Sequence, residues 1–221
     1  TGTIENFGNG WYRCTFKKNT AVTPAYFQIG LVDTDGFSSP TSNGSSYIWG
    51  AQLEASSYAT SLINTTSSSA TRVADVCTKT GIGALIGGTS GTVFFDIKTN
   101  PVLSSANYKQ FCYYVDSASA QSYMFLGSTN LITTNSNWGS LSGATPLVAN
   151  TRYKVALVYA PNDFALYVNG VSVATASSGT PKDNVSLQIG QFNGSENAEF
   201  VFNQYTHFPS RLTNADLASL T

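Results

Sequence analysis

The side chains best suited to chemistry in this sequence are aromatic rings and neutral amides. Trp138 lies in the loop-like segment NSNWGS, and four polar candidates lie near predicted strand ends: Tyr123, Gln191, Asn193 and Asn203. An aromatic ring can stack on the apolar face of a pyranose, while amides hydrogen-bond its hydroxyls without any net charge. These residues therefore predict a carbohydrate-binding site centred on Trp138. In the alternative interpretation each residue is structural, because a lone Trp in a β-sandwich is more often packed than bound to a ligand.

Catalytic residues are harder to find. A glycosidase needs two carboxylates on either side of the scissile bond, but Glu54, Glu196 and Glu199 are scattered and Asp96 is isolated. His207, the one histidine, sits in YTHFPSRL without the glycines of a nucleophile elbow, which favours a structural role. We predict no enzyme and no catalytic residue. The alternative that stays open is a polysaccharide-degrading enzyme whose carboxylates come together from different strands.

Metal and cofactor sites are not predicted either. Cys14, Cys77 and Cys112 are widely spaced and lack a C-x-x-C pair. Cys112, inside the apolar run FCYYV, is expected to be a buried thiol. Asp33 and Asp35 form a D-x-D-G piece that is typical of a turn, with a calcium site as the less favoured interpretation.

The composition limits the partners. Charged residues make up 10% of the chain and the net charge is −1, against roughly 25% charged residues in an average soluble domain. The surface is therefore expected to consist of Ser, Thr, Asn and Gly, as is common in extracellular and virion-surface proteins. Nucleic acid is excluded as a partner because no basic field exists to collect phosphates. No apolar run of about 18 residues occurs, so we predict no membrane insertion.

The chain from residue 76 onward predicts an all-β fold with two stacked antiparallel sheets, since short β-branched and aromatic runs alternate with turn residues. The dipeptide Asn169-Gly170 predicts a tight hairpin. A short terminal helix is expected after a cap at Ser210 or Thr213. The predicted strands are Thr92–Thr99, Tyr108–Asp116, Ser122–Leu126, Arg152–Tyr159, Phe164–Val168, Val171–Thr175, Ser186–Gln191 and Glu199–His207.

The first sixty residues predict a smaller β segment, with strands at Gly10–Phe16, Ala25–Val32 and Ser46–Glu54. So few strands bury too little surface to fold alone comfortably. We interpret residues 1–63 as the final strands of an incomplete β jelly-roll and residues 64–75 as a linker. Thr1 almost directly precedes a strand, which indicates a fragment of a longer polypeptide.

Two stretches resemble known families. YIWGAQLEASSYATSLINTTSSSATRVADV, from Tyr47 to Val76, resembles a segment of bacteriophage tail and other virion proteins, in which the last jelly-roll strand carries W-G-A-Q-L-E. GWYRCTF is similar to an earlier strand of that module. TRYKVALVYAPNDFALYVNGVSVAT and the later RLTNADLASL resemble the laminin-G and pentraxin-like modules of the concanavalin superfamily. In those modules Trp often stands where this chain has Tyr153.

The resemblances imply a function beyond what the residues alone indicate. They imply a concanavalin-type lectin sandwich over residues 76–221, carried on a phage tail fibre, tail spike or capsid fibre at the virion surface. Its implied partners are host surface polysaccharide or glycoprotein and other virion subunits. A homotrimer is expected from the resemblance alone. A virion structural or decoration protein without a sugar site is the alternative.

Overall fold

The computed structural model describes residues 2–17, 29–32, 44–55, 59–72, 75–86, 88–104, 108–136, 138, 140–192, 198 and 200–221. The chain divides into two units, residues 1–72 and 73–221. In the described part, no helix is both long and apolar enough to cross a membrane. About 6% of the described residues are helical and the strands pair antiparallel, so the predicted all-β fold is confirmed.

In its described residues, the first unit contains one antiparallel hairpin, formed by β1 (Gly2–Gly8) and β2 (Trp11–Phe16). Asn9 and Gly10 join the strands with φ of 51° and 78°, a conformation that these two residues tolerate well. The predicted strand at Gly10–Phe16 is thus confirmed as β2. Of the predicted strand Ala25–Val32, residues 25–28 lie outside the described residues, and residues 29–32 are irregular.

The predicted strand at Ser46–Glu54 is wrong, because this segment is irregular where the structure describes it. A strand needs a neighbouring backbone to pair with, and the described part of this unit pairs only β1 with β2. Alternating apolar residues were therefore not enough to predict a strand here.

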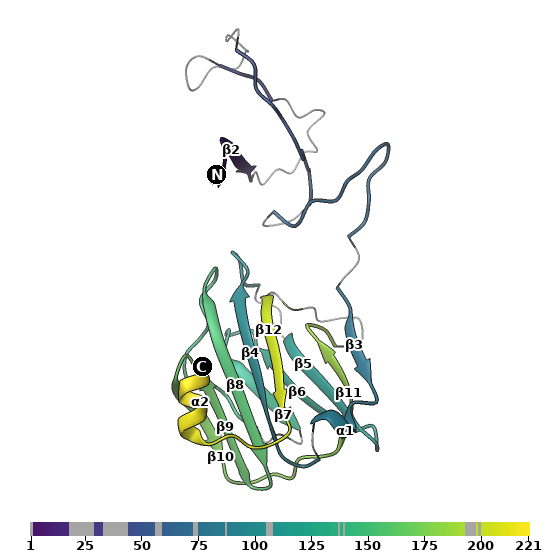
Figure 1. Ribbon diagram of the computed structural model, residues 1–221, viewed down its shortest axis with the longest axis vertical. Helices are drawn as coiled ribbons and strands as arrows, with labels where there is room; N and C mark the ends of the chain where they lie inside the picture. Colours follow the sequence, from purple (N-terminus) through teal and green to yellow (C-terminus); the bar gives the residue numbers. More distant parts are fainter. Residues whose placement is uncertain are drawn as a thin grey trace. The chain divides into compact units, whose positions relative to one another are not determined.

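The second unit is a sandwich of two five-stranded antiparallel sheets (Figure 1). Sheet one has the order β10-β9-β8-β4-β12, and sheet two has the order β3-β11-β5-β6-β7. The strands are β3 (Cys77–Thr80), β4 (Gly91–Thr99), β5 (Lys109–Asp116), β6 (Gln121–Leu126), β7 (Ile132–Ser136), β8 (Arg152–Ala160), β9 (Asp163–Val168), β10 (Val171–Ala176), β11 (Asn184–Ile189) and β12 (Phe200–Phe208). A short helix, α1 (Gly83–Ile86), follows β3.

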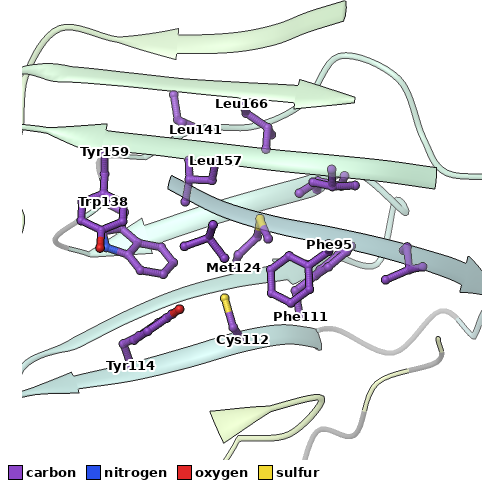
Figure 2. Packing of buried hydrophobic residues seen from close by; sticks show 14 of the residues in the cluster. Phe95, Phe111, Cys112, Tyr114, Met124, Trp138, Leu141, Leu157, Tyr159 and Leu166 are labelled. Atoms are coloured by element: carbon purple, nitrogen blue, oxygen red, sulfur yellow. The ribbon is translucent and has the colours of Figure 1, made fainter. Parts of the chain in front are cut away.

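The space between the sheets holds the main core (Figure 2). Val155, Leu157 and Tyr159 are buried there, as their alternation on β8 predicts, while Tyr153 on the same face is partly buried. Cys112 is buried as predicted, and burial raises the pKa of its thiol. Each large apolar side chain buried in this way contributes roughly 1.5–3 kcal/mol.

The helix α2 (Asn214–Leu220) packs on the outer face of sheet one (Figure 1). Thr213 and Asp216 form a reciprocal capping box, so the predicted cap at Thr213 is confirmed. Leu217 is buried against the sheet residues Phe94, Ala156 and Val158. The helix therefore covers the part of this face that β4, β8 and β9 form.

The single histidine belongs to a buried tyrosine network. His207 Nε2 lies 2.9 Å from the Tyr159 hydroxyl, and Nδ1 lies 3.0 Å from the Tyr114 hydroxyl and 3.3 Å from that of Tyr205. These contacts join the two sheets, since Tyr114 is on β5 and His207 is on β12. His207 therefore has the structural position that its sequence context predicts.

This network makes stability dependent on pH. Burial lowers the pKa of His207 from 6.5 to about 4, because the charged ring loses its water. Between these values the unfolded chain binds a proton that the folded chain does not. Stability is therefore expected to fall as the pH drops from about 6.5 to 4, by up to roughly 1.4 kcal/mol per pH unit. Urea melts of the wild type and His207→Gln measure this, and parallel pH dependences would contradict the assignment.

The same network leaves no space for a side chain at Gly91, the first residue of β4. A Cβ at this position would lie 2.5 Å from the Tyr159 hydroxyl oxygen and 2.9 Å from His207 Nε2. Gly91→Ala is expected to destabilise the fold by about 1–3 kcal/mol, the usual cost of overpacking. The control is Gly88→Ala, whose Cβ meets no heavy atom within 4 Å. Equal denaturation midpoints for the two variants would show that the network accommodates the added methyl group without loss of stability, and would contradict this prediction.

Candidate functional site

The outer face of sheet two carries a row of neutral polar and aromatic side chains. Gln188 on β11 pairs with Tyr113 on β5, Tyr113 with Tyr123 on β6, and Tyr123 with Asn135 on β7. Directly opposed residues in an antiparallel sheet point to the same face. This face is the outer one, because Tyr114 and Met124, the next residues along β5 and β6, are in the core. Four strands therefore present one continuous row.

A β-bulge brings Gln110 to the same face. The register of β5 shifts between Gln110 and Cys112, so that Gln110 opposes Phe125 while Cys112 opposes Met124. The extra residue, Phe111, lets two consecutive side chains, Phe111 and Cys112, both enter the core. Gln110 then points outward beside Phe125.

Five aromatic rings cluster around this amide. Tyr108 packs on Phe125 at 4.9 Å between ring centroids, and Phe192 packs edge-on against Tyr113 at 4.7 Å. Tyr123 lies 5.9 Å from Phe125 and 6.2 Å from Phe192. Tyr113 and Phe125 are buried, whereas Tyr108 is exposed and the rings of Tyr123 and Phe192 are half-buried. The buried rings form a floor and the other three form a rim.

The rim encloses a small pocket of about 170 Å³, lined by Tyr108, Gln110, Tyr123 and Phe192. Its volume is below the roughly 300 Å³ of a pocket for a drug-sized ligand, so it suits one compact group. The lining joins aromatic faces to hydrogen-bonding groups, which is the combination that a sugar ring requires. We call these four residues the sheet-face pocket.

The polar groups of the site can both donate and accept hydrogen bonds. Asn135 Nδ2 donates to the Tyr123 hydroxyl at 2.9 Å, so the phenolic proton can be donated to a ligand. Burial, together with the neighbouring Tyr123, raises the pKa of Tyr113. The Tyr113 phenol is therefore uncharged at neutral pH.

Trp138 is not in this site. Its indole is fully buried, 5.4 Å from the ring of Tyr159 in a stacked arrangement and 4.9 Å from that of Tyr114 (Figure 2). The prediction that Trp138 stacks on a sugar is wrong, because neither face of a buried ring is open to a ligand. Trp138 is a core residue.

The other predicted residues are divided between two faces. Tyr123 lines the sheet-face pocket, and Gln191 precedes Phe192 and donates from Nε2 to Thr78 Oγ1 on β3 at 3.3 Å. Asn203 lies elsewhere, on β12 of sheet one, where it donates to the carboxylate of Asp96 at 3.1 Å. Asn193 lies outside the described residues. Of the predicted set, only Tyr123 lines the sheet-face pocket.

The two buried carboxylates in the described part have structural contacts. Asp96 forms a bidentate ion pair with Arg152, which together with Asn203 lowers the pKa of Asp96. Asp116 accepts from the backbone N–H groups of Ala118 and Ala120 in the turn after β5. Among the described residues, no group of three or more His, Cys, Asp or Glu side chains could hold a metal ion.

A larger hollow of about 340 Å³ lies between β7 and β10, at the open edge of the sandwich. Most of its lining is aliphatic: Ile132, Leu147, Val148, Val168, Val171 and Val173. Such a lining offers few partners for hydroxyl groups, so volume alone does not make it the better sugar site. The sheet-face pocket is smaller but has the appropriate chemistry.

Sequence comparison identifies the family. Residues 87–218 match the family model described as the concanavalin A-like lectin/glucanases superfamily. The chain belongs to this superfamily. The resemblance inferred from the hairpin and terminal motifs is therefore confirmed at this level, and the superfamily domain includes the sheet-face pocket. No curated protein matches the chain.

Solved structures similar to this lectin/glucanase domain include three kinds of protein. A Trypanosoma rangeli sialidase complexed with the inhibitor DANA is 14% identical, with a TM-score of 0.47, over 60% of this chain and 22% of the sialidase. The heptameric SAP-like pentraxin of Limulus polyphemus is 16% identical, with a TM-score of 0.45, over 59% of this chain and 69% of the pentraxin. The CBM40 of Ruminococcus gnavus IT-sialidase, bound to α2,3 sialyllactose, is 13% identical, with a TM-score of 0.48, over 62% of this chain and 85% of the CBM40. The chain thus spans about a fifth of the sialidase.

Sequence reasoning missed Tyr108, Gln110 and Phe192. Strict alternation along Tyr108–Asp116 would place Gln110 on the same face as Cys112 and Tyr114. The bulge between Gln110 and Cys112 instead puts Gln110 on the opposite face. The available signal was the alternation of Tyr123 and Phe125 on β6, which puts two aromatic rings on the face opposite Met124. An aromatic pair on an outward face is a better indicator of a site than a single Trp in a polar loop.

Proposed function

We propose that residues 73–221 form a carbohydrate-binding domain whose ligand lies on the sheet-face pocket. One observation carries the proposal: an amide, Gln110, lines a pocket together with aromatic rings on the outer face of sheet two, the face opposite the one on which α2 packs. Superfamily membership supports the same class of ligand. The buried carboxylates Asp96 and Asp116 are engaged in structural contacts, which favours binding without cleavage.

The biological setting that we propose is the surface of a bacteriophage particle, on a tail fibre, tail spike or capsid fibre. There the domain would hold the particle to host polysaccharide or glycoprotein, as part of a trimer. The support comes from the segment Tyr47–Val76, which resembles virion modules, and from a surface with few charges.

The test is a glycan screen with the full chain, accompanied by an assay for reducing ends released from each polysaccharide that binds. Binding to at least one glycan without release of reducing ends is expected. Failure to bind any glycan would overturn the proposed function, and release of reducing ends would replace it with an enzymatic one.

A second candidate is a virion structural protein without a sugar site. Large apolar side chains in the first unit favour it, since Tyr47 is 91% exposed, Trp49 76% and Leu53 81%. Exposed apolar patches are typical of surfaces that other protein segments cover. This candidate predicts subunit assembly in light scattering together with a negative glycan screen.

A further inference from the structure

The sheet-face pocket contains a buried acceptor that has no partner. Gln110 is 1% exposed, and its Oε1 atom forms no hydrogen bond to any residue that the structure describes. Buried polar atoms are nearly always hydrogen-bonded, so this unpartnered oxygen in the lining of the sheet-face pocket needs an explanation.

A ligand can supply the hydrogen bond that the Gln110 oxygen lacks. The terminal torsion of a glutamine side chain has broad preferences, so the Gln110 amide can turn its oxygen toward the pocket at little cost. An amide oxygen only accepts, and its partner must therefore be a donor, such as a sugar hydroxyl or an amide N–H. An ionised carboxylate or sulfate group has only acceptor oxygens, so that group cannot donate to Gln110 Oε1.

None of the described residues that line the sheet-face pocket carries a charged side chain. Lys109, the adjacent basic residue, opposes Leu126, a core residue, and so points to the other face of the sheet. Its ammonium group donates to the backbone carbonyls of Ser104 and Gly127. An acidic ligand would lose its water in this pocket without gaining an ion pair.

Building on the proposed function, we propose that the sheet-face pocket selects a neutral sugar residue, which donates a hydroxyl or amide N–H to Gln110, and rejects acidic sugars. The Tyr123 hydroxyl supplies the matching donor, so the pair suits an alcohol, which both donates and accepts. Tyr108, Tyr123 and Phe192 contact the apolar faces of the ring.

The first test compares matched glycans with the full chain and needs no variant. The probes are glucose, galactose and N-acetylglucosamine oligosaccharides, each beside a sialylated, uronic-acid or sulfated form of the same chain. At least tenfold stronger binding to the neutral member of a pair is expected. Equal or stronger binding to the acidic member would overturn the selectivity while leaving the proposed function intact. Absence of binding to every probe would overturn both.

The second test distinguishes a ligand-binding amide from a structural one. Gln110→Met keeps the length of the side chain and removes the unpartnered oxygen. We expect an unfolding midpoint equal to or above that of the wild type, together with affinity for the best neutral glycan lowered about five- to tenfold. A lower midpoint with unchanged affinity would assign Gln110 a structural role and overturn the proposal. Gln204→Met, on the exposed part of sheet one, is the control and should change neither quantity.

Discussion

Replacing Trp138 by alanine is expected to lower the free energy of unfolding by about 3–5 kcal/mol, the usual cost of removing a buried Trp. The indole is fully buried between Tyr159 and Tyr114, so the substitution opens a cavity between the sheets and removes two ring contacts. Chemical denaturation of the full chain measures the loss. A change below about 1 kcal/mol would mean that Trp138 is not the core residue that the structure shows.

Trp138→Phe is the matched variant. The indole Nε1 is buried without a hydrogen-bond partner among the described residues, and phenylalanine removes that N–H while keeping a ring in place. Most of the stability should therefore be retained, and glycan binding should be unchanged. If Trp138→Phe abolished binding while the fold stayed intact, the original sequence-based assignment of Trp138 to the sugar site would be correct after all.

Tyr123→Ala is expected to weaken binding of the best glycan at least thirtyfold, about 2 kcal/mol, as for other aromatic residues central to an interface. The substitution removes a ring from the rim of the sheet-face pocket and also the hydroxyl that receives the Asn135 hydrogen bond. Isothermal titration calorimetry with the glycan found in the screen measures the effect.

Two further tyrosine variants separate the contributions. Tyr123→Phe keeps the ring and removes the hydroxyl, so an intermediate loss of up to about tenfold is expected, the size of one hydrogen bond. Tyr47→Ala removes a tyrosine that is exposed in the first unit and should leave affinity unchanged. Wild-type affinity in Tyr123→Ala would place the sugar site elsewhere.

The sandwich could be predicted from sequence because its signals are local. Alternation along Arg152–Tyr159 identifies one face of β8, and Asn169-Gly170 fixes the turn between β9 and β10, with φ of 47° and 82°. The capping residues Thr213 and Asp216 likewise determine where α2 begins. Each feature depends on residues within a few positions of one another.

The position of Trp138 depends on contacts that local sequence does not contain. Its polar neighbours predict an exposed loop. In the structure, Thr134 and Leu141 are joined by a backbone hydrogen bond of 2.9 Å, and the Thr134 hydroxyl accepts a second one, which closes the loop at its base. The indole then enters the core beside Tyr159, which lies on a strand of the other sheet. Only the tertiary structure shows that the core accommodates the indole of Trp138.

The sheet-face pocket was predicted only in part for a related reason. Residue type alone was enough to select Tyr123, whereas Gln110 needs the β-bulge to reach the outer face. A bulge changes the facing of every residue that precedes it, and no residue in KQFCYY marks its place. Sequence could therefore predict that aromatic and amide groups form the site, but not which of them meet.

The most direct test of the sheet-face site is the NMR chemical-shift map of the isotope-labelled full chain, titrated with the neutral glycan that binds best. The largest chemical-shift changes are expected at the four pocket residues, Tyr108, Gln110, Tyr123 and Phe192. The shifts of Asn203 and of Leu147 and Val171 in the aliphatic hollow should not change. Changes concentrated at Asn203 or in that hollow would contradict the sheet-face site.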